Sequence, residues 1–115
     1  MPVSWGNRRN KHNARPKIVD GIRFDSTKEA NRYQELKLLE KADEISELKL
    51  HHPFSLEVNG RLICVYEADF VYFEHDRKNH SARLVIEDTK GYRTREYKIK
   101  KKLLKAIYGY DIVET

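Results

Sequence analysis

The spacing of apolar side chains changes along the chain, and the first change separates a hairpin from a helix. Residues 17–24 place Asp20-Gly21 between two short stretches of β-branched and aromatic residues, which predicts a tight hairpin. In residues 25–42 the apolar side chains recur at helical spacing, and Ser26 with Glu29 three residues later forms a capping box. The chain is therefore predicted to begin with a β-hairpin and a capped helix.

From Ile45 onward the apolar period shortens to two, as it does in β-strands. Asn59-Gly60 lies between two alternating runs and predicts a type I′ hairpin turn. The second run, residues 62–73, is long enough for a central strand, and residues 83–90 form the next predicted strand after a polar loop.

The last part of the chain returns to helical spacing. Residues 95–108 predict a second helix that ends at Gly109, and residues 110–115 predict a short final strand. The buried stripe of this helix is expected to consist of Ile99, Leu103, Leu104 and Ile107. The order of elements predicts an α/β (α+β) fold, with a central mixed sheet flanked by helices.

The ends of the chain differ in character from its middle. Residues 1–17 are polar, basic and without periodicity, so they predict a flexible arm, and residues 18–115 predict a single domain. With 39% hydrophobic and 36% charged residues, the chain can form one small core. No apolar run approaches the ~20 residues of a membrane span, and no secretory signal is evident. The single Cys64 excludes an internal disulfide, and we expect a cytoplasmic protein.

Positive charge is concentrated in two blocks. Residues 1–17 carry +5 and residues 90–105 carry +7, and because the whole chain carries +5, the remaining residues carry −7. Two basic blocks around an acidic middle indicate a polyanionic partner, of which nucleic acid is the most common. A solvated lysine-rich face is the alternative interpretation.

Three acidic residues and one lysine form the candidate site. Strand alternation places Asp88 and Lys90 on one face and Glu87 on the other. A hairpin centred in the loop at residues 76–81 pairs Asp69 with Asp88. Two carboxylates ~4 Å apart repel each other, and a divalent cation such as Mg²⁺ removes that repulsion. Helical spacing turns Glu29 toward the sheet as a third carboxylate, although it is equally explained as a helix cap.

These residues resemble the motif of the PD-(D/E)XK nuclease superfamily. In "EADF" Asp69 matches the first aspartate of the motif, although Ala68 replaces the preceding proline; in "VIEDTKG" residues 88–90 match (D/E)-x-K, and Glu29 matches a helical glutamate. The chain is also similar to small phage and prophage proteins of unknown function and, in layout, to phage-type Holliday-junction resolving endonucleases. The resemblance implies a restriction-endonuclease-like core over nearly the whole domain.

The resemblance also implies an activity. It implies a phage-related endodeoxyribonuclease that uses Mg²⁺ or Mn²⁺ to hydrolyse phosphodiester bonds, selective for branched DNA. The catalytic residues would be Glu29, Asp69, Asp88 and Lys90, and the carbonyl oxygen of Thr89 would join the three carboxylates as a metal ligand. The basic residues that would bind DNA are Arg93, Arg95, Lys98, Lys101, Lys102 and Lys105.

Partners and alternatives follow from the same residues. Cutting both strands of a branched substrate needs two active sites, so we expect a homodimer, with phage recombination or packaging proteins as further partners. A non-catalytic nucleic-acid-binding module is the alternative function. His51-His52 is not expected to bind a metal, because neighbours on a strand point to opposite faces. The aromatic residues are expected in the core, among them Tyr33, Phe54, Tyr66, Phe70 and Tyr72.

Overall fold

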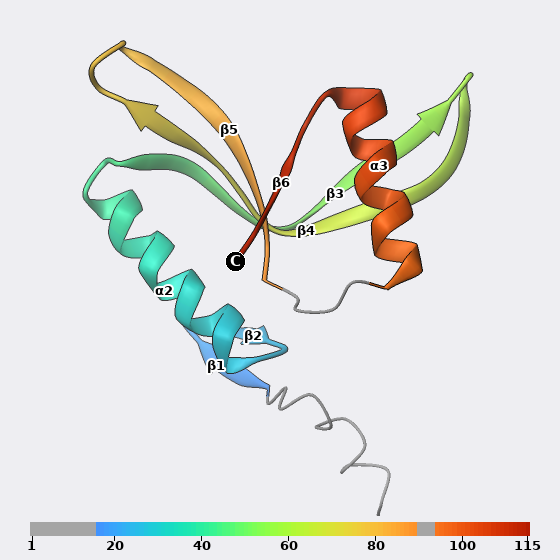
Figure 1. The fold of residues 1–115 in the computed structure, drawn as a ribbon. Coiled ribbons are helices and arrows are strands. Elements are labelled where there is room, and N and C mark those ends of the chain that lie inside the picture. The colour runs from blue at the N-terminus through green and yellow to red at the C-terminus, as the bar shows by residue number, and fades with distance from the viewer. Residues whose placement is uncertain (1–15, 90–93) are drawn as a thin grey trace, which may run out of the picture. The chain divides into compact units, whose positions relative to one another are not determined.

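The computed structural model of the protein describes residues 16–89 and 94–115 (Figure 1). The chain divides into two compact units, of which the first ends at Leu38 and the second is Leu39–Thr115. Lys90 and Arg93, to which the sequence assigns functions, lie outside the described residues. Within those two ranges, no helix has the length and apolar character needed to cross a membrane.

The first unit contains the predicted hairpin. Strands β1 (Lys17–Val19) and β2 (Ile22–Phe24) pair antiparallel. Both residues of the connecting turn have a positive φ, 54° at Asp20 and 76° at Gly21. A type I′ turn needs this left-handed backbone at both positions, so the hairpin prediction is confirmed.

Helix α2 (Thr27–Lys41) begins where the capping pattern predicts. The hydroxyl of Ser26 accepts a hydrogen bond from the N–H of Glu29 at 3.1 Å, which satisfies one donor of the first helical turn. One turn later, the phenol of Tyr33 donates to Asp20 in the hairpin turn at 2.9 Å. The prediction that Ser26 caps the helix is therefore confirmed, and Tyr33 links the helix to the hairpin.

The second unit is built on a four-stranded sheet in the order β3-β4-β5-β6. The two long hairpins are antiparallel, whereas β6 runs parallel to β5 and is reached through helix α3 (Figure 1). This arrangement confirms the predicted α+β fold with a mixed sheet. The elements are β3 (Ile45–Val58), β4 (Arg61–Asp76), β5 (Ser81–Asp88), α3 (Arg95–Tyr108) and β6 (Ile112–Glu114).

Helix α3 contacts β3 and β4 through one narrow face. It starts at the N-cap Thr94 and ends at Gly109, which has a φ of 79° and donates its N–H to Lys105. Leu104 is fully buried, but Ile99 is 52% exposed, so Ile99 was wrongly predicted to be buried. At 100° per residue, Ile99 lies about 140° around the helix from Leu104, whereas Tyr97 lies about 20° from it. Tyr97 therefore contributes to the inner face instead.

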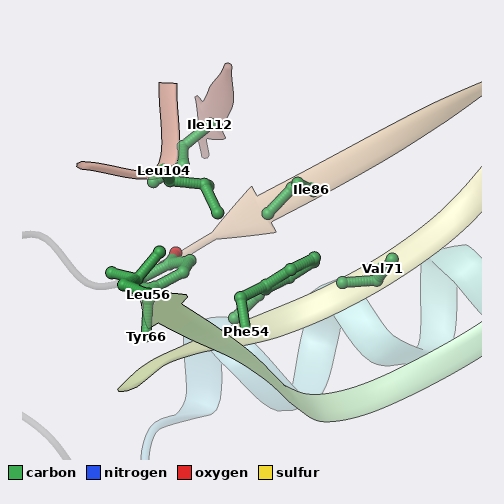
Figure 2. Packing of buried hydrophobic residues seen from close by; sticks show 8 residues of the cluster. Phe54, Leu56, Tyr66, Val71, Ile86, Leu104 and Ile112 are labelled. Carbon is green, nitrogen blue, oxygen red and sulfur yellow. The ribbon is translucent and has the colours of Figure 1, made fainter. Parts of the chain in front are cut away.

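The core of this unit lies between α3 and the sheet. Figure 2 shows Leu104 and Ile112 packed with side chains of β3, β4 and β5. All five aromatic residues expected to be buried are buried, Tyr33 in the first unit and Phe54, Tyr66, Phe70 and Tyr72 in the second. Half-buried Cys64 packs against the same cluster.

Strand β3 bends where it passes Asp69. Its pairing with β4 skips one position, between Leu50↔Phe70 and His52↔Ala68, and His51 at that position has a φ of 49°. A left-handed residue inside a strand is rare for a side chain other than glycine and rotates the chain locally. Beside it in β4, Ala68 and Val71 belong to the same core although they are an odd number of residues apart.

Candidate active site

The two aspartates lie on the neighbouring strands β4 and β5, next to the last residues that pair. All seven pairs of β4 with β5, from Phe70↔Glu87 to Asp76↔Ser81, keep one register. The next position of that register places Asp69 opposite Asp88. The loop length between the strands predicted this register, and the structure confirms it.

Asp69 is held by the residue that follows Asp88. It is only 2% exposed, and its Oδ2 accepts two hydrogen bonds from Thr89, one from the backbone N–H at 2.7 Å and one from the hydroxyl at 2.8 Å. Two donors on one oxygen fix the orientation of the carboxylate plane. Thr89 thus orients Asp69 through groups that the sequence did not single out, and the role predicted for its carbonyl oxygen stays a prediction.

Asp88 is held from the core side. It is 3% exposed, and its Oδ2 accepts a hydrogen bond from the phenol of Tyr66 at 2.8 Å. Burial, followed by the charge of Asp88, raises the pKa of Tyr66 far above its usual value. The phenol therefore stays protonated and acts as the hydrogen-bond donor. The backbone carbonyl of Asp88 accepts from the N–H of Thr115 at 3.0 Å, which anchors the end of β5.

Glu87, the residue before Asp88 in β5, is also a buried carboxylate, but it has a different hydrogen-bond partner. It is 1% exposed, next to Asp88 in sequence, and the phenol of Tyr72 donates to it. Two adjacent buried carboxylates are therefore each bound by a different tyrosine of β4. This arrangement supports the prediction that Glu87 and Asp88 face opposite ways.

His51 is a candidate ligand that the sequence argument set aside. One of its ring nitrogens lies within 4.8 Å of a carboxylate oxygen of Asp69, and its Nδ1 lies 3.6 Å from Glu67 Oε1. Strand alternation does not hold at a residue with left-handed backbone, and no sequence signal marks that bend. Glu29 belongs to the other compact unit, so its role as a ligand stays a prediction.

A cleft of about 290 Å³ opens beside Asp88. It lies between β4 and the beginning of α3, and Tyr66 and Tyr97 form part of its wall, with their ring centroids 6.4 Å apart. Its remaining lining residues are Val65, Glu67, Thr94, Glu96 and Lys100. The cleft gives access to the buried end of β5 from the side of α3.

A family model covers most of the chain. The family is described as a protein of unknown function, DUF1064, and its model matches residues 9–113. The chain belongs to the DUF1064 family. No curated protein and no solved structure matches it.

The DUF1064 chain brings together some of its predicted site residues and separates others. Asp69 is joined to Thr89 by two hydrogen bonds, and Asp88 is the residue before Thr89. The predicted DNA-binding residues of α3 that the structure describes form a separate, largely exposed set: Arg95, Lys98, Lys101, Lys102 and Lys105. In chemical terms, this DUF1064 protein presents oriented carboxylate oxygens at a cleft, with a basic helix beginning next to it.

Proposed function

We propose that this protein is an endonuclease that hydrolyses phosphodiester bonds in DNA with the aid of Mg²⁺ or Mn²⁺. One observation carries the proposal, namely that Asp69 and Asp88 are both buried, lie on neighbouring strands one position beyond the last observed pair, and each accept a hydrogen bond from a side-chain hydroxyl. Two buried carboxylates side by side repel each other strongly. A divalent cation would remove that repulsion.

The available atoms fit such an ion. Carboxylate oxygens are the ligands that Mg²⁺ prefers. Because Thr89 occupies Oδ2 of Asp69 with two hydrogen bonds, we assign Oδ1 of Asp69 to the metal, together with a carboxylate oxygen of Asp88. When bound, the ion would supply an activated water and offset charge on the phosphate.

The chain's own residues have distinct roles in this proposal. Thr89 and Tyr66 fix the two carboxylates before substrate arrives, so no free energy is lost in orienting them during the reaction. We assign to Lys90, two residues after Asp88, the role of orienting the attacking water or stabilising the charge that develops on the phosphate. The preference for branched DNA is proposed on the resemblance to junction-resolving endonucleases.

The test is cleavage of branched, nicked and linear DNA with Mg²⁺. We expect the wild type to cut at least one substrate and Asp88→Ala and Lys90→Ala to be inactive. Glu87→Gln is the matched control, because Glu87 is the neighbouring buried carboxylate and points to the other face. It should retain activity.

Two results would contradict the proposal. Equal cleavage by the wild type, Asp88→Ala and Lys90→Ala would show that the site is wrong. Salt-sensitive DNA binding by the wild type, with no hydrolysis and no heat of Mg²⁺ binding in calorimetry, would instead identify a non-catalytic nucleic-acid-binding module.

A further inference from the structure

Four of the five lysines of α3 are predicted to bind DNA, and the structure divides these four into two groups. Lys101 Nζ lies 3.3 Å from Glu114 Oε2, and Lys105 Nζ lies 3.0 Å from Asp111 Oδ2. Both pairs link α3 to the segment that contains β6. Among the described residues, no comparable ion pair involves Lys98 or Lys102, and both are exposed. Two of the four lysines thus have carboxylate partners and two do not.

All four lysines line one groove. The groove has a volume of about 410 Å³ and runs between α3 and the end of the chain, bordered by Tyr97, Tyr110, Asp111 and Glu114. Four lysines against two carboxylates leave a surplus of two positive charges. Because Lys101 and Lys105 already have partners, this surplus lies at Lys98 and Lys102, one helical turn apart.

Tyr97 connects this groove with the candidate active site. It lines the groove and also the cleft beside Asp88. Its phenol donates to Glu114 at 2.6 Å, the same carboxylate that pairs with Lys101. A polyanion bound at the carboxylates can therefore continue past Tyr97 and meet Lys98 and Lys102 next.

We infer that Lys98 and Lys102 bind backbone phosphates of duplex DNA next to the cut site, whereas Lys101 and Lys105 hold α3 to β6 and add little to DNA binding. This inference rests on the proposed function, since it takes DNA as the substrate. Contacts of this kind carry no sequence information, but they make affinity depend on salt.

Two double variants with the same change in net charge test the inference. Lys98→Gln with Lys102→Gln is compared with Lys101→Gln with Lys105→Gln in full-length protein. Binding to a labelled duplex is measured by fluorescence anisotropy over a range of salt concentrations, with EDTA present to prevent hydrolysis. Each lost phosphate contact lowers the slope of log K against log salt by about 0.9.

We expect the Lys98/Lys102 variant to lose about 2 from this slope and to bind unrelated sequences equally weakly. The Lys101/Lys105 variant should lose clearly less from the slope and melt at a slightly lower temperature. Lys98→Arg with Lys102→Arg retains the charge and should retain the slope, so a folding defect in the glutamine variant would not mask the answer.

Equal losses of slope in the two glutamine variants would overturn the inference, as would an unchanged slope in the Lys98/Lys102 variant. Either result can occur while the wild type still cleaves DNA, in which case the proposed function stands. Conversely, the expected slopes without any hydrolysis would support the inference about the lysines and contradict the proposed nuclease activity. A wild type that does not bind DNA would overturn both.

Discussion

The charged residues at the two ends of the β4–β5 hairpin lie in different environments: they are exposed at one end and buried at the other. At the closed end, Arg83 pairs with Glu74 at 2.9 Å, and both side chains are about half exposed or more. At the open end, Asp69 and Asp88 are at most 3% exposed and are bound by hydroxyl and amide donors. Exposed ion pairs contribute about 0–1 kcal/mol, whereas a buried charge persists only when its surroundings compensate for lost hydration. We therefore expect the charges at the closed end to be dispensable and the carboxylates at the open end, where we propose the active site, to be required.

Removing one charge at each end should give the largest contrast. Asp69→Asn keeps the shape of the side chain but not its charge, and because a bound metal supplies several kcal/mol to the transition state, we expect cleavage to fall about 10³-fold or more. Glu74→Gln at the closed end should leave cleavage unchanged. Thermal melting with and without Mg²⁺ provides a second readout, since only Asp69→Asn should abolish stabilisation by the ion. Equal activity of the two variants would contradict the assignment.

The second-largest effect is expected when the phenol hydroxyl beside a buried carboxylate is removed. Tyr66→Phe and Tyr72→Phe each delete a hydrogen bond to a carboxylate, so each should lower the free energy of unfolding by about 1.5–3 kcal/mol, measured by urea denaturation. Only Tyr66→Phe affects an assigned metal ligand, and it should also reduce cleavage about 10-fold to 100-fold. A loss of activity in Tyr72→Phe of the same size would show that the effect is general destabilisation.

A smaller effect is expected when the Thr89 hydroxyl is removed. Thr89→Val keeps the branched shape and the N–H bond to Asp69 but loses the 2.8 Å hydroxyl bond, so cleavage should fall about 10-fold. Thr89→Ser retains the hydroxyl and should restore most of the rate. Titration with Mg²⁺ should locate the loss in metal affinity; an effect of Thr89→Ser as large as that of Thr89→Val would instead point to packing.

The smallest effect is expected at the closed end. Hydrogen bonds from the side chain and backbone of Asn79 hold the pKa of Asp76 below its ordinary value of 3.8. A lowered pKa in the folded state stabilises the protein above the unfolded value, and this contribution disappears as pH falls through the folded value. The stability difference between wild type and Asp76→Ala should therefore be small and constant above about pH 4 and vanish in more acidic solution. A difference that persists in strong acid would mean that Asp76 acts by other means.

Local signals in the sequence were sufficient for most of the fold. The Asp20-Gly21 and Asn59-Gly60 turns formed as predicted because type I′ geometry needs residues that tolerate a positive φ. The register of Asp69 with Asp88 followed from loop length, because an antiparallel hairpin fixes every later pair once its turn is known. At Ile99 the prediction failed because the helix has one narrow buried face, and Tyr97 lies closer to its centre.

The candidate site was less predictable than the fold. Its carboxylates were recognisable by residue type and spacing, but the donors that orient them were not. Tyr66 reaches Asp88 from another strand, and His51 approaches Asp69 at a left-handed position that carries no glycine or other bulge signal. Such a bend depends on tertiary packing, which alternation along a single strand cannot express.

The bend in β3 also affects how the molecule behaves toward its own copies. Within the described sheet, β3 is a 14-residue strand with a neighbour on one side only, and a long flat edge of this kind is a template for adding a strand of another molecule. Left-handed residues at Glu47 and His51, and Pro53 with no N–H to offer, interrupt that edge at three places. The backbone conformation of His51, which lies near Asp69, is thus one of three features that make this edge a poorer template for an added strand.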